Sequence, residues 1–325
     1  MVSLFDNIYP TRRLVSANQL QVMLKVFQQD LMNGLVEISY PQDEKVLLLL
    51  NGGRITCVYH CEGDATMRFP LSDLYLLLGG HPEGQIRVCE LAPSFLRAVK
   101  TIVEQPHSSE TYPSSTAALP SIIQKNQARP EPTLLHFHWP RAEGFVFLPG
   151  NNFSPRQYAF LSEGQPSDSA AAVSMITRWS ESECTILRYA GDLESDIWKE
   201  NSIHLGFSLL IEHIMRRHEE LVGHMLSRKL EDSLNRLCHT QSWSISVAGS
   251  TVDDVQVFDT LNDAAAAYRM ILDTTARQMI AVIGARLFNE TLETGLDSLG
   301  GQLRRAVEQN DLVAAFSIPV VRVNL

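Results

Sequence analysis

The 325-residue sequence lacks the short motifs that mark common nucleotide and ester sites. It has no Gly-Lys pair, which excludes a P-loop, and neither G-x-G-x-x-G nor G-x-S-x-G occurs. Basic residues are also scarce, because 27 Lys and Arg stand against 37 Asp and Glu, for a formal charge of -10. Nucleic acids and anionic membranes are bound through clustered Lys and Arg. Neither is therefore expected as a partner.

Long apolar runs and a cysteine framework are absent as well. The densest apolar runs, 46–50 and 207–211, are far shorter than the roughly 20 residues of a spanning helix. The five cysteines are odd in number and scattered, which fits a reducing compartment better than a disulfide scaffold. The start of the chain, MVSLFDNIYPTRR, has no signal-peptide pattern. We therefore expect a cytoplasmic protein without membrane insertion.

The sequence does contain one pattern that occurs twice, roughly 100 residues apart. The copies read GLVEISYPQDEKVLLLLNGGRITCVYHCEG from Gly34 and LLHFHWPRAEGFVFLPGNNFSPRQYAFLSEG from Leu134. The matched positions are Tyr40-Pro41 with Trp139-Pro140, Glu44 with Glu143, 46–49 with 145–148, and Glu62-Gly63 with Glu163-Gly164. In both copies a helical segment (71–78 and 170–179) and a strand (85–91 and 184–190) follow. One fold unit used twice is predicted.

These patterns predict an α+β chain of four parts. Residues 1–105 form a small antiparallel sheet with helices, and residues 133–191 form a second, degenerate copy. Residues 106–132, rich in Pro and Ser and poor in large apolar side chains, are expected to be a disordered linker. Residues 192–325 are expected to be mainly helical, with a hairpin at 243–258 and an edge strand in the tail.

A single long amphipathic helix is predicted over 193–239. Its apolar residues recur at steps of three and four, which places one stripe on one face that another surface must cover. Leu210 and Leu221 both lie on this stripe and are expected to be buried. We expect the stripe to be buried by the later helices in a bundle, by a second copy in a homodimer through 193–239, or by a partner protein.

No metal, cofactor or catalytic residue is predicted. The stretch 218–224, HEELVGH, resembles a zinc helix, but its histidines are six apart instead of four. On a strand, Cys57 and Cys61 share one face, whereas His60 points to the other. His136 and His138 do share a face. Such a pair is able to bind a metal, although a solvated sheet face explains it as well.

An alternative function is histidine phosphotransfer through His218. This residue lies on the long helix, follows Arg216-Arg217, and precedes Glu219 and Gly223. A phosphoacceptor needs an exposed imidazole, basic residues for the phosphoryl oxygens, and a small residue that leaves space. The match to the H-x-L-K-G pattern is loose, and His218 falls on the apolar stripe, which favours a packed side chain.

The first copy resembles the PATAN domain of bacterial signalling proteins over roughly residues 10–105. The resemblance rests on a helix, then Gly34-Leu-Val-Glu-Ile38, an apolar strand, and Asn51-Gly-Gly-Arg-Ile-Thr-Cys57. It implies a non-enzymatic module for protein contacts, near response regulators, kinases or small GTPases. The sequence therefore predicts an adaptor in signal transduction. A small-ligand sensor or an enzyme whose site leaves no linear motif is the remaining alternative.

Overall fold

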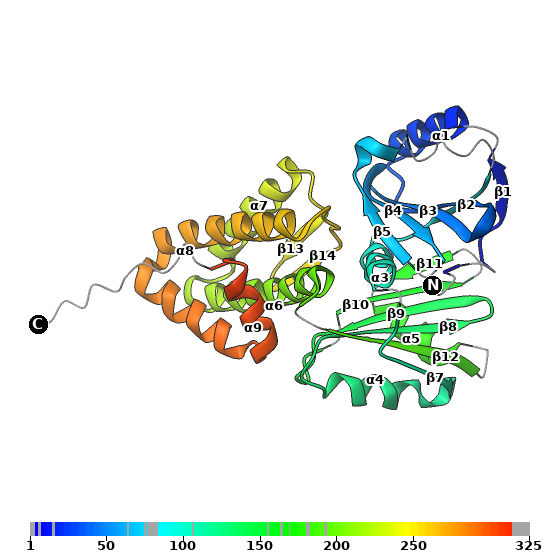
Figure 1. Cartoon of the computed structure of the whole chain (residues 1–325). Helices are drawn as coiled ribbons and strands as arrows, with labels where there is room; N and C mark the ends of the chain where they lie inside the picture. The colour runs from blue at the N-terminus through cyan, green and yellow to red at the C-terminus, as the bar shows by residue number, and fades with distance from the viewer. Residues whose placement is uncertain are drawn as a thin grey trace, which may run out of the picture. The chain divides into compact units, whose positions relative to one another are not determined.

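The computed structural model describes residues 4–5, 8–14, 17–63, 65–74, 76, 84–105, 107–154, 156–162, 165–168, 170–179, 183–191 and 194–313. The chain divides into two compact units, Met1–Gly191 (unit 1) and Asp192–Leu325 (unit 2). Unit 1 is built on antiparallel sheets and unit 2 mostly on helices, which confirms the predicted α+β class (Figure 1). None of the helices in the described part of the chain has the length and apolar composition needed to cross a bilayer.

Unit 1 begins with a six-stranded sheet, sheet A. Its strands follow the order β1-β6-β2-β3-β4-β5. The elements are β1 (Thr11–Leu14), α1 (Ala17–Gln29), β2 (Gly34–Tyr40), β3 (Glu44–Asn51), β4 (Arg54–Glu62), β5 (Ala65–Phe69), β6 (Gly84–Glu90) and α3 (Pro93–Glu104), with short 3-10 turns at Pro41–Asp43 and Leu71–Asp73. Of the helix predicted at 71–78, residues 71–74 and 76 are described and are helical, starting with the 3-10 turn, whereas residues 75, 77 and 78 lie outside the described residues.

A second six-stranded sheet, sheet B, repeats this topology. Its order is β11-β10-β9-β8-β12-β7. The elements are β7 (Glu110–Ser115), α4 (Leu119–Gln127), β8 (Thr133–Trp139), β9 (Ala142–Leu148), β10 (Arg156–Ser162), β11 (Gln165–Asp168), α5 (Ala170–Arg178) and β12 (Glu183–Ala190). β3 and β9 both pair with their two chain neighbours in antiparallel sense, which confirms their predicted equivalence. Glu163-Gly164 lies outside the described residues.

The register of the two sheets corrects the sequence alignment by one residue. Three residues separate Tyr40 from its partner Glu44, whereas two separate Trp139 from its partner Ala142. Counted from these turns, Glu143 occupies the position of Lys45, not that of Glu44. The shorter turn therefore moves every residue of β9 by one place relative to the predicted match.

The predicted linker is wrong, because residues 106–132 contain folded elements. β7 pairs with β12 along its whole length, and α4 buries Leu119 and Ile123 in the core beside sheet B. The prolines of this segment occupy positions that tolerate them. Pro113 lies on a strand at the sheet edge, and Pro120 lies in the first turn of α4. The second copy of the topology therefore begins near residue 110.

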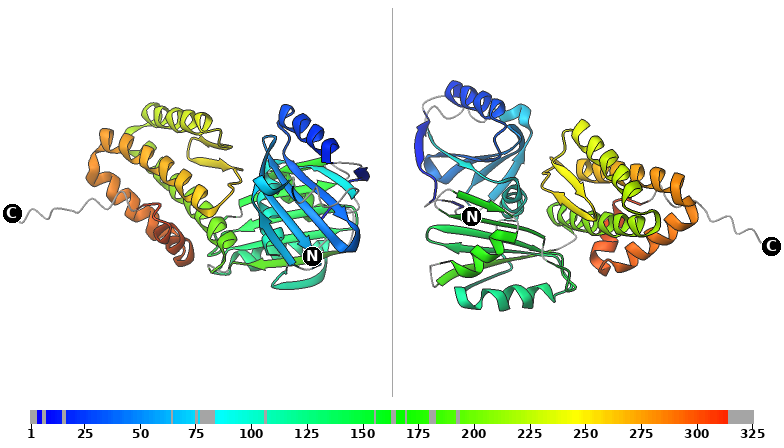
Figure 2. Two further views of the ribbon diagram at one scale, coloured as in Figure 1. Left: turned by 45° about the horizontal axis from the view of Figure 1, so that its top comes forward. Right: turned by 180° about the vertical axis from the view of Figure 1, so that it is seen from behind.

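The elements of unit 1 form layers (Figures 1 and 2). Helix α1 packs on the outer face of sheet A through a cluster that includes Leu20, Val36 and Ile38. Helices α4 and α5 cover the outer face of sheet B around Phe137 and Trp139. Helix α3 contacts β2 and β3 of sheet A and also β9 and β10 of sheet B. Because α3 lies between the inner faces, its residues Ser94–Val103 are all buried.

In each sheet, the turn between the second and third strands, counted from β2 or β8, lies against the end of the first helix, α1 or α4. In sheet A, Gly53 has a φ of 75° and donates its N–H to Met32, and a Cβ there would lie 2.6 Å from backbone atoms at the end of α1. In sheet B, Gly150 has a φ of 83°, and a Cβ there would meet the backbone of Arg129 and Pro130 after α4. Only glycine fits both requirements.

Unit 2 contains α6 (Asp196–Val222), α7 (His224–Thr240), a hairpin of β13 (Ile245–Ala248) and β14 (Thr251–Asp254), α8 (Leu261–Ser298) and α9 (Gly301–Gln309). The hairpin confirms the predicted one. The single helix predicted over 193–239 is wrong, because Gly223, with a φ of 80°, separates α6 from α7. Gly284, with a φ of 81°, kinks α8 in the same way. The edge strand predicted in the tail lies outside the described residues.

Candidate functional site

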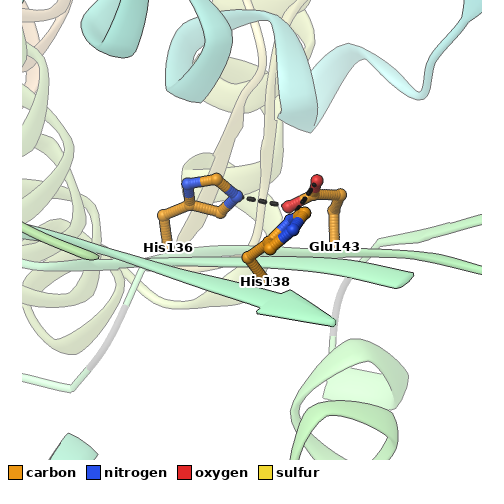
Figure 3. Close-up of side chains that lie close together, drawn as sticks. All are labelled: His136, His138 and Glu143. Carbon is orange, nitrogen blue, oxygen red and sulfur yellow. Dashed lines mark hydrogen bonds and ion pairs between the residues drawn. The ribbon is translucent and has the colours of Figure 1, made fainter. Parts of the chain in front are cut away.

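Two histidines that the sequence placed on one strand face meet a carboxylate from the next strand (Figure 3). His136 and His138 lie on β8, and Glu143 lies on β9 directly opposite His138. The interpretation of this face as solvated is wrong. His136 and Glu143 are 0% and 1% exposed, because the face is the inner one and α3 covers it. We call His136, His138 and Glu143 the inner-face triad.

The two imidazoles bind different oxygens of the same carboxylate. Nε2 of His136 donates to Oε2 of Glu143, and Nδ1 of His138 donates to Oε1 at 2.8 Å. The ring of His136 stacks on Phe145 at a centroid distance of 4.7 Å and an interplanar angle of 13°. The side chain of His138 is 37% exposed, so one edge of the triad reaches solvent.

The electrostatics of the triad favour a charged carboxylate. Burial raises the pKa of Glu143, but the charges of His136 and His138 and their hydrogen bonds outweigh burial and lower it below its usual value. Tyr189 is fully buried, and its pKa is raised by burial and then by the negative charge of Glu143. The Tyr189 hydroxyl and Nδ1 of His136 have no hydrogen-bond partner among the described residues.

Sheet A fills the equivalent positions with a different set. By the register of β2 and β3, the places of His136, His138 and Glu143 are held by Glu37, Ser39 and Lys45. There the Lys45 ammonium lies 3.3 Å from Glu37, and the Ser39 hydroxyl donates to Glu37 at 3.1 Å. Arg87 on the neighbouring strand β6 adds a second cation 3.8 Å from Glu37, so two cations and a hydrogen bond satisfy this carboxylate in sheet A.

Unit 2 contains a second buried polar cluster that the sequence did not reveal. Nδ1 of His204 lies 2.8 Å from Oδ2 of Asp254 and 3.0 Å from the Tyr268 hydroxyl, which itself donates to Asp254 at 2.8 Å. The three residues come from α6, β14 and α8 and are all at most 4% exposed. Their hydrogen bonds hold the hairpin against two helices. Their sequence separations follow no fixed motif, so no local signal indicates them.

The structure does not assemble the other donor sets considered from the sequence. His218 is buried without a partner for either ring nitrogen among the described residues, and burial lowers its pKa. His224 is exposed instead and pairs with Glu219. His60 pairs with Glu44 at 2.7 Å, whereas Cys57 and Cys61 are buried free thiols. Within the described ranges, the inner-face triad alone brings three potential ligands together.

The surface of unit 2 carries a groove of about 360 Å³ in which two leucines lie among polar and charged residues. Leu221 on α6 and Leu287 on α8 line it at 37% and 40% exposure. Leu221 was expected in the core, but it comes two residues before the glycine that ends α6, where the stripe leaves the bundle. His213 and Arg217 from α6 and Glu290, Thr291 and Thr294 from α8 complete the lining. We call this the Leu221–Leu287 groove.

Unit 1 has a hollow of about 450 Å³ between α1 and the strands β1 and β6. Met23, Phe27 and Val88 make it largely apolar, and Arg12 and Glu90 provide charges.

Comparison of the chain with protein-family models, with curated proteins and with solved structures gave no match.

Proposed function

We propose that this chain is a non-enzymatic adaptor of bacterial signal transduction that binds an amphipathic helix of a partner protein in the Leu221–Leu287 groove. Two leucines that line one groove and remain more than one third exposed carry the proposal. Exposed apolar side chains in a concave site are typical of surfaces that a partner covers. The PATAN resemblance of the first module supports the same class of function.

The charges around the groove favour a helix with a mixed polar border. Arg217 and His213 line the α6 side, and Glu290 lines the α8 side. A partner helix with an apolar stripe, acidic residues on one flank and basic residues on the other complements both sides. The partner is a response regulator, a kinase or a small GTPase.

Affinity capture from the native cells tests this proposal. The full chain should retain a signalling protein of one of these classes, and a Leu221→Asp, Leu287→Asp variant should lose it. Met270→Asp is the matched control, because Met270 is also on α8 and is 40% exposed but does not line the groove. With the purified partner, the double substitution should weaken binding at least about tenfold, or about 1.4 kcal/mol.

Other results would contradict the proposal. If the Asp variants bind the partner as tightly as the wild type, the groove is not the docking site. If light scattering shows a dimer of the wild type that the double variant abolishes, the groove is filled by a second copy. If the captured protein is a substrate on which this chain acts as an enzyme, or if it is unrelated to signalling, the proposed adaptor role is wrong.

A second candidate function, small-molecule sensing, is favoured by the hollow beside α1. Its volume falls within the range of small-ligand sites, and a few charges border an apolar lining. A thermal-shift screen of metabolites should then find a ligand whose effect is lost on replacing Phe27 with Asp. A screen without stabilising ligands would leave the adaptor as the better account.

A further inference from the structure

Beyond the adaptor role, we propose that the inner-face triad binds one divalent first-row metal ion, with zinc best suited to its donors. Histidine nitrogens and carboxylate oxygens are ordinary zinc ligands. Two histidines and one carboxylate with an open position also form a recognised set for other first-row metals. A structural or regulatory ion is compatible with a protein that performs no catalysis.

The donor atoms already converge. One potential ligand atom from each of the three residues lies within 4.8 Å of the others. Nδ1 of His138 and Oε1 of Glu143 are 2.8 Å apart. In a tetrahedral site with bonds of about 2.0–2.1 Å, neighbouring ligand atoms are about 3.3 Å apart. Admitting the ion therefore requires Nδ1 of His138 and Oε1 of Glu143 to separate by roughly half an ångström. Nε2 of His136 has to move farther from the Glu143 carboxylate, and the most distant donors have to approach one another.

Metal binding replaces the hydrogen bonds of the triad. Each metal-binding nitrogen gives up its proton, to the other ring nitrogen where the imidazole is neutral and to solvent where it is charged, and then offers its lone pair to the metal. The carboxylate of Glu143 already faces both imidazoles and accepts a hydrogen bond from each of them. It contributes one negative charge to a dication, so the site remains positive by one charge and accepts water as a further ligand.

The surroundings hold the donors in place. His136 is fixed by stacking on Phe145, and Glu143 lies on a strand paired on both sides. Preorganised ligands lose little freedom when a metal binds. The partly exposed side chain of His138 provides the route of entry.

Sheet A shows that the fold does not require this donor set. Glu37, Ser39 and Lys45 hold the same three positions with an ion pair and a hydrogen bond. That set contains a fixed positive charge and no imidazole, so it repels a cation. The second sheet therefore departs from the first in the direction that creates a metal site.

The test uses the untagged full-length protein, stripped with EDTA and dialysed against zinc. The wild type should retain about one equivalent by elemental analysis. His136→Gln, His138→Gln and Glu143→Gln should each lose it. His60→Gln is the matched control and should retain it, because His60 pairs with Glu44 in sheet A without a third ligand.

A triple variant separates metal loss from misfolding. His136→Glu, His138→Ser and Glu143→Lys together place the ion pair and hydroxyl of sheet A at these positions, so this variant should lose zinc, and its circular dichroism spectrum shows whether it is folded. X-ray absorption of the wild type with zinc should show two imidazoles in the ligand shell. No retained zinc in the wild type, zinc retained by the triple variant, or a spectrum without two imidazoles would overturn the proposal.

Discussion

Burial of His218 makes the folded state sensitive to mild acid. The imidazole is 2% exposed, and desolvation lowers its pKa below the usual value near 6.5. Below that value the unfolded chain takes up a proton that the folded chain resists. The stabilising contribution is therefore complete above about pH 6.5 and is lost as the pH falls toward the lowered value in the folded protein.

Replacement of His218 with Gln should remove this pH dependence. Between about pH 7.5 and pH 5.5, the free energy of unfolding measured in urea should fall more for the wild type than for the variant. The difference is about 1.4 kcal/mol for each tenfold difference in proton affinity between the unfolded and folded states. Signalling output at neutral pH should remain intact. Acid-labile phosphate that is incorporated at His218 and lost in the variant would contradict this packing role.

At the scale of elements, the segment once expected to be a linker contributes to the core. Leu119 is fully buried against residues of sheet B. Replacing it with Ala should cost about 2–5 kcal/mol of unfolding free energy, the usual range for a buried leucine. In a disordered linker the same change has almost no effect. Trypsin should also leave the bond after Lys125 intact in the native wild type, and rapid cleavage there would refute the assignment of α4.

Sequence patterns predicted elements where local chemistry decides them. The alternation of β8 follows from the residues themselves, and the same-face relation of His136 and His138 was predicted. Glu143 was missed as their partner because its place depends on hairpin register. A two-residue turn at 140–141 puts position 143 opposite 138, so the signal was present in the turn length.

Features that depend on packing between distant elements were not predictable. Nothing local shows that α3 covers the inner face of sheet B, so His136 was interpreted as solvated. The helical pattern likewise continues on both sides of Gly223. The break between α6 and α7 is visible only in the structure, where Gly223 has a φ of 80°. The composition of 106–132 led to the wrong prediction of a linker. Prolines on an edge strand and in the first turn of a helix cannot be told from linker prolines by composition.

At the scale of the whole molecule, the chain should unfold in two steps. The main core of unit 2, which contains Leu210, involves only residues of that unit, and the cores around α1 and around α4 involve only residues of unit 1. Because the chain divides into two compact units, calorimetry of the full chain should resolve two transitions. Leu210→Asp buries a charge in a fully buried position and should lower only one transition, by at least about 3 kcal/mol. Leu221→Asp, at an exposed position on the same helix, is the control and should move it by less than about 1 kcal/mol. Leu119→Ala should lower the other transition alone, whereas a single transition shifted by both core substitutions would show that the two units fold as one.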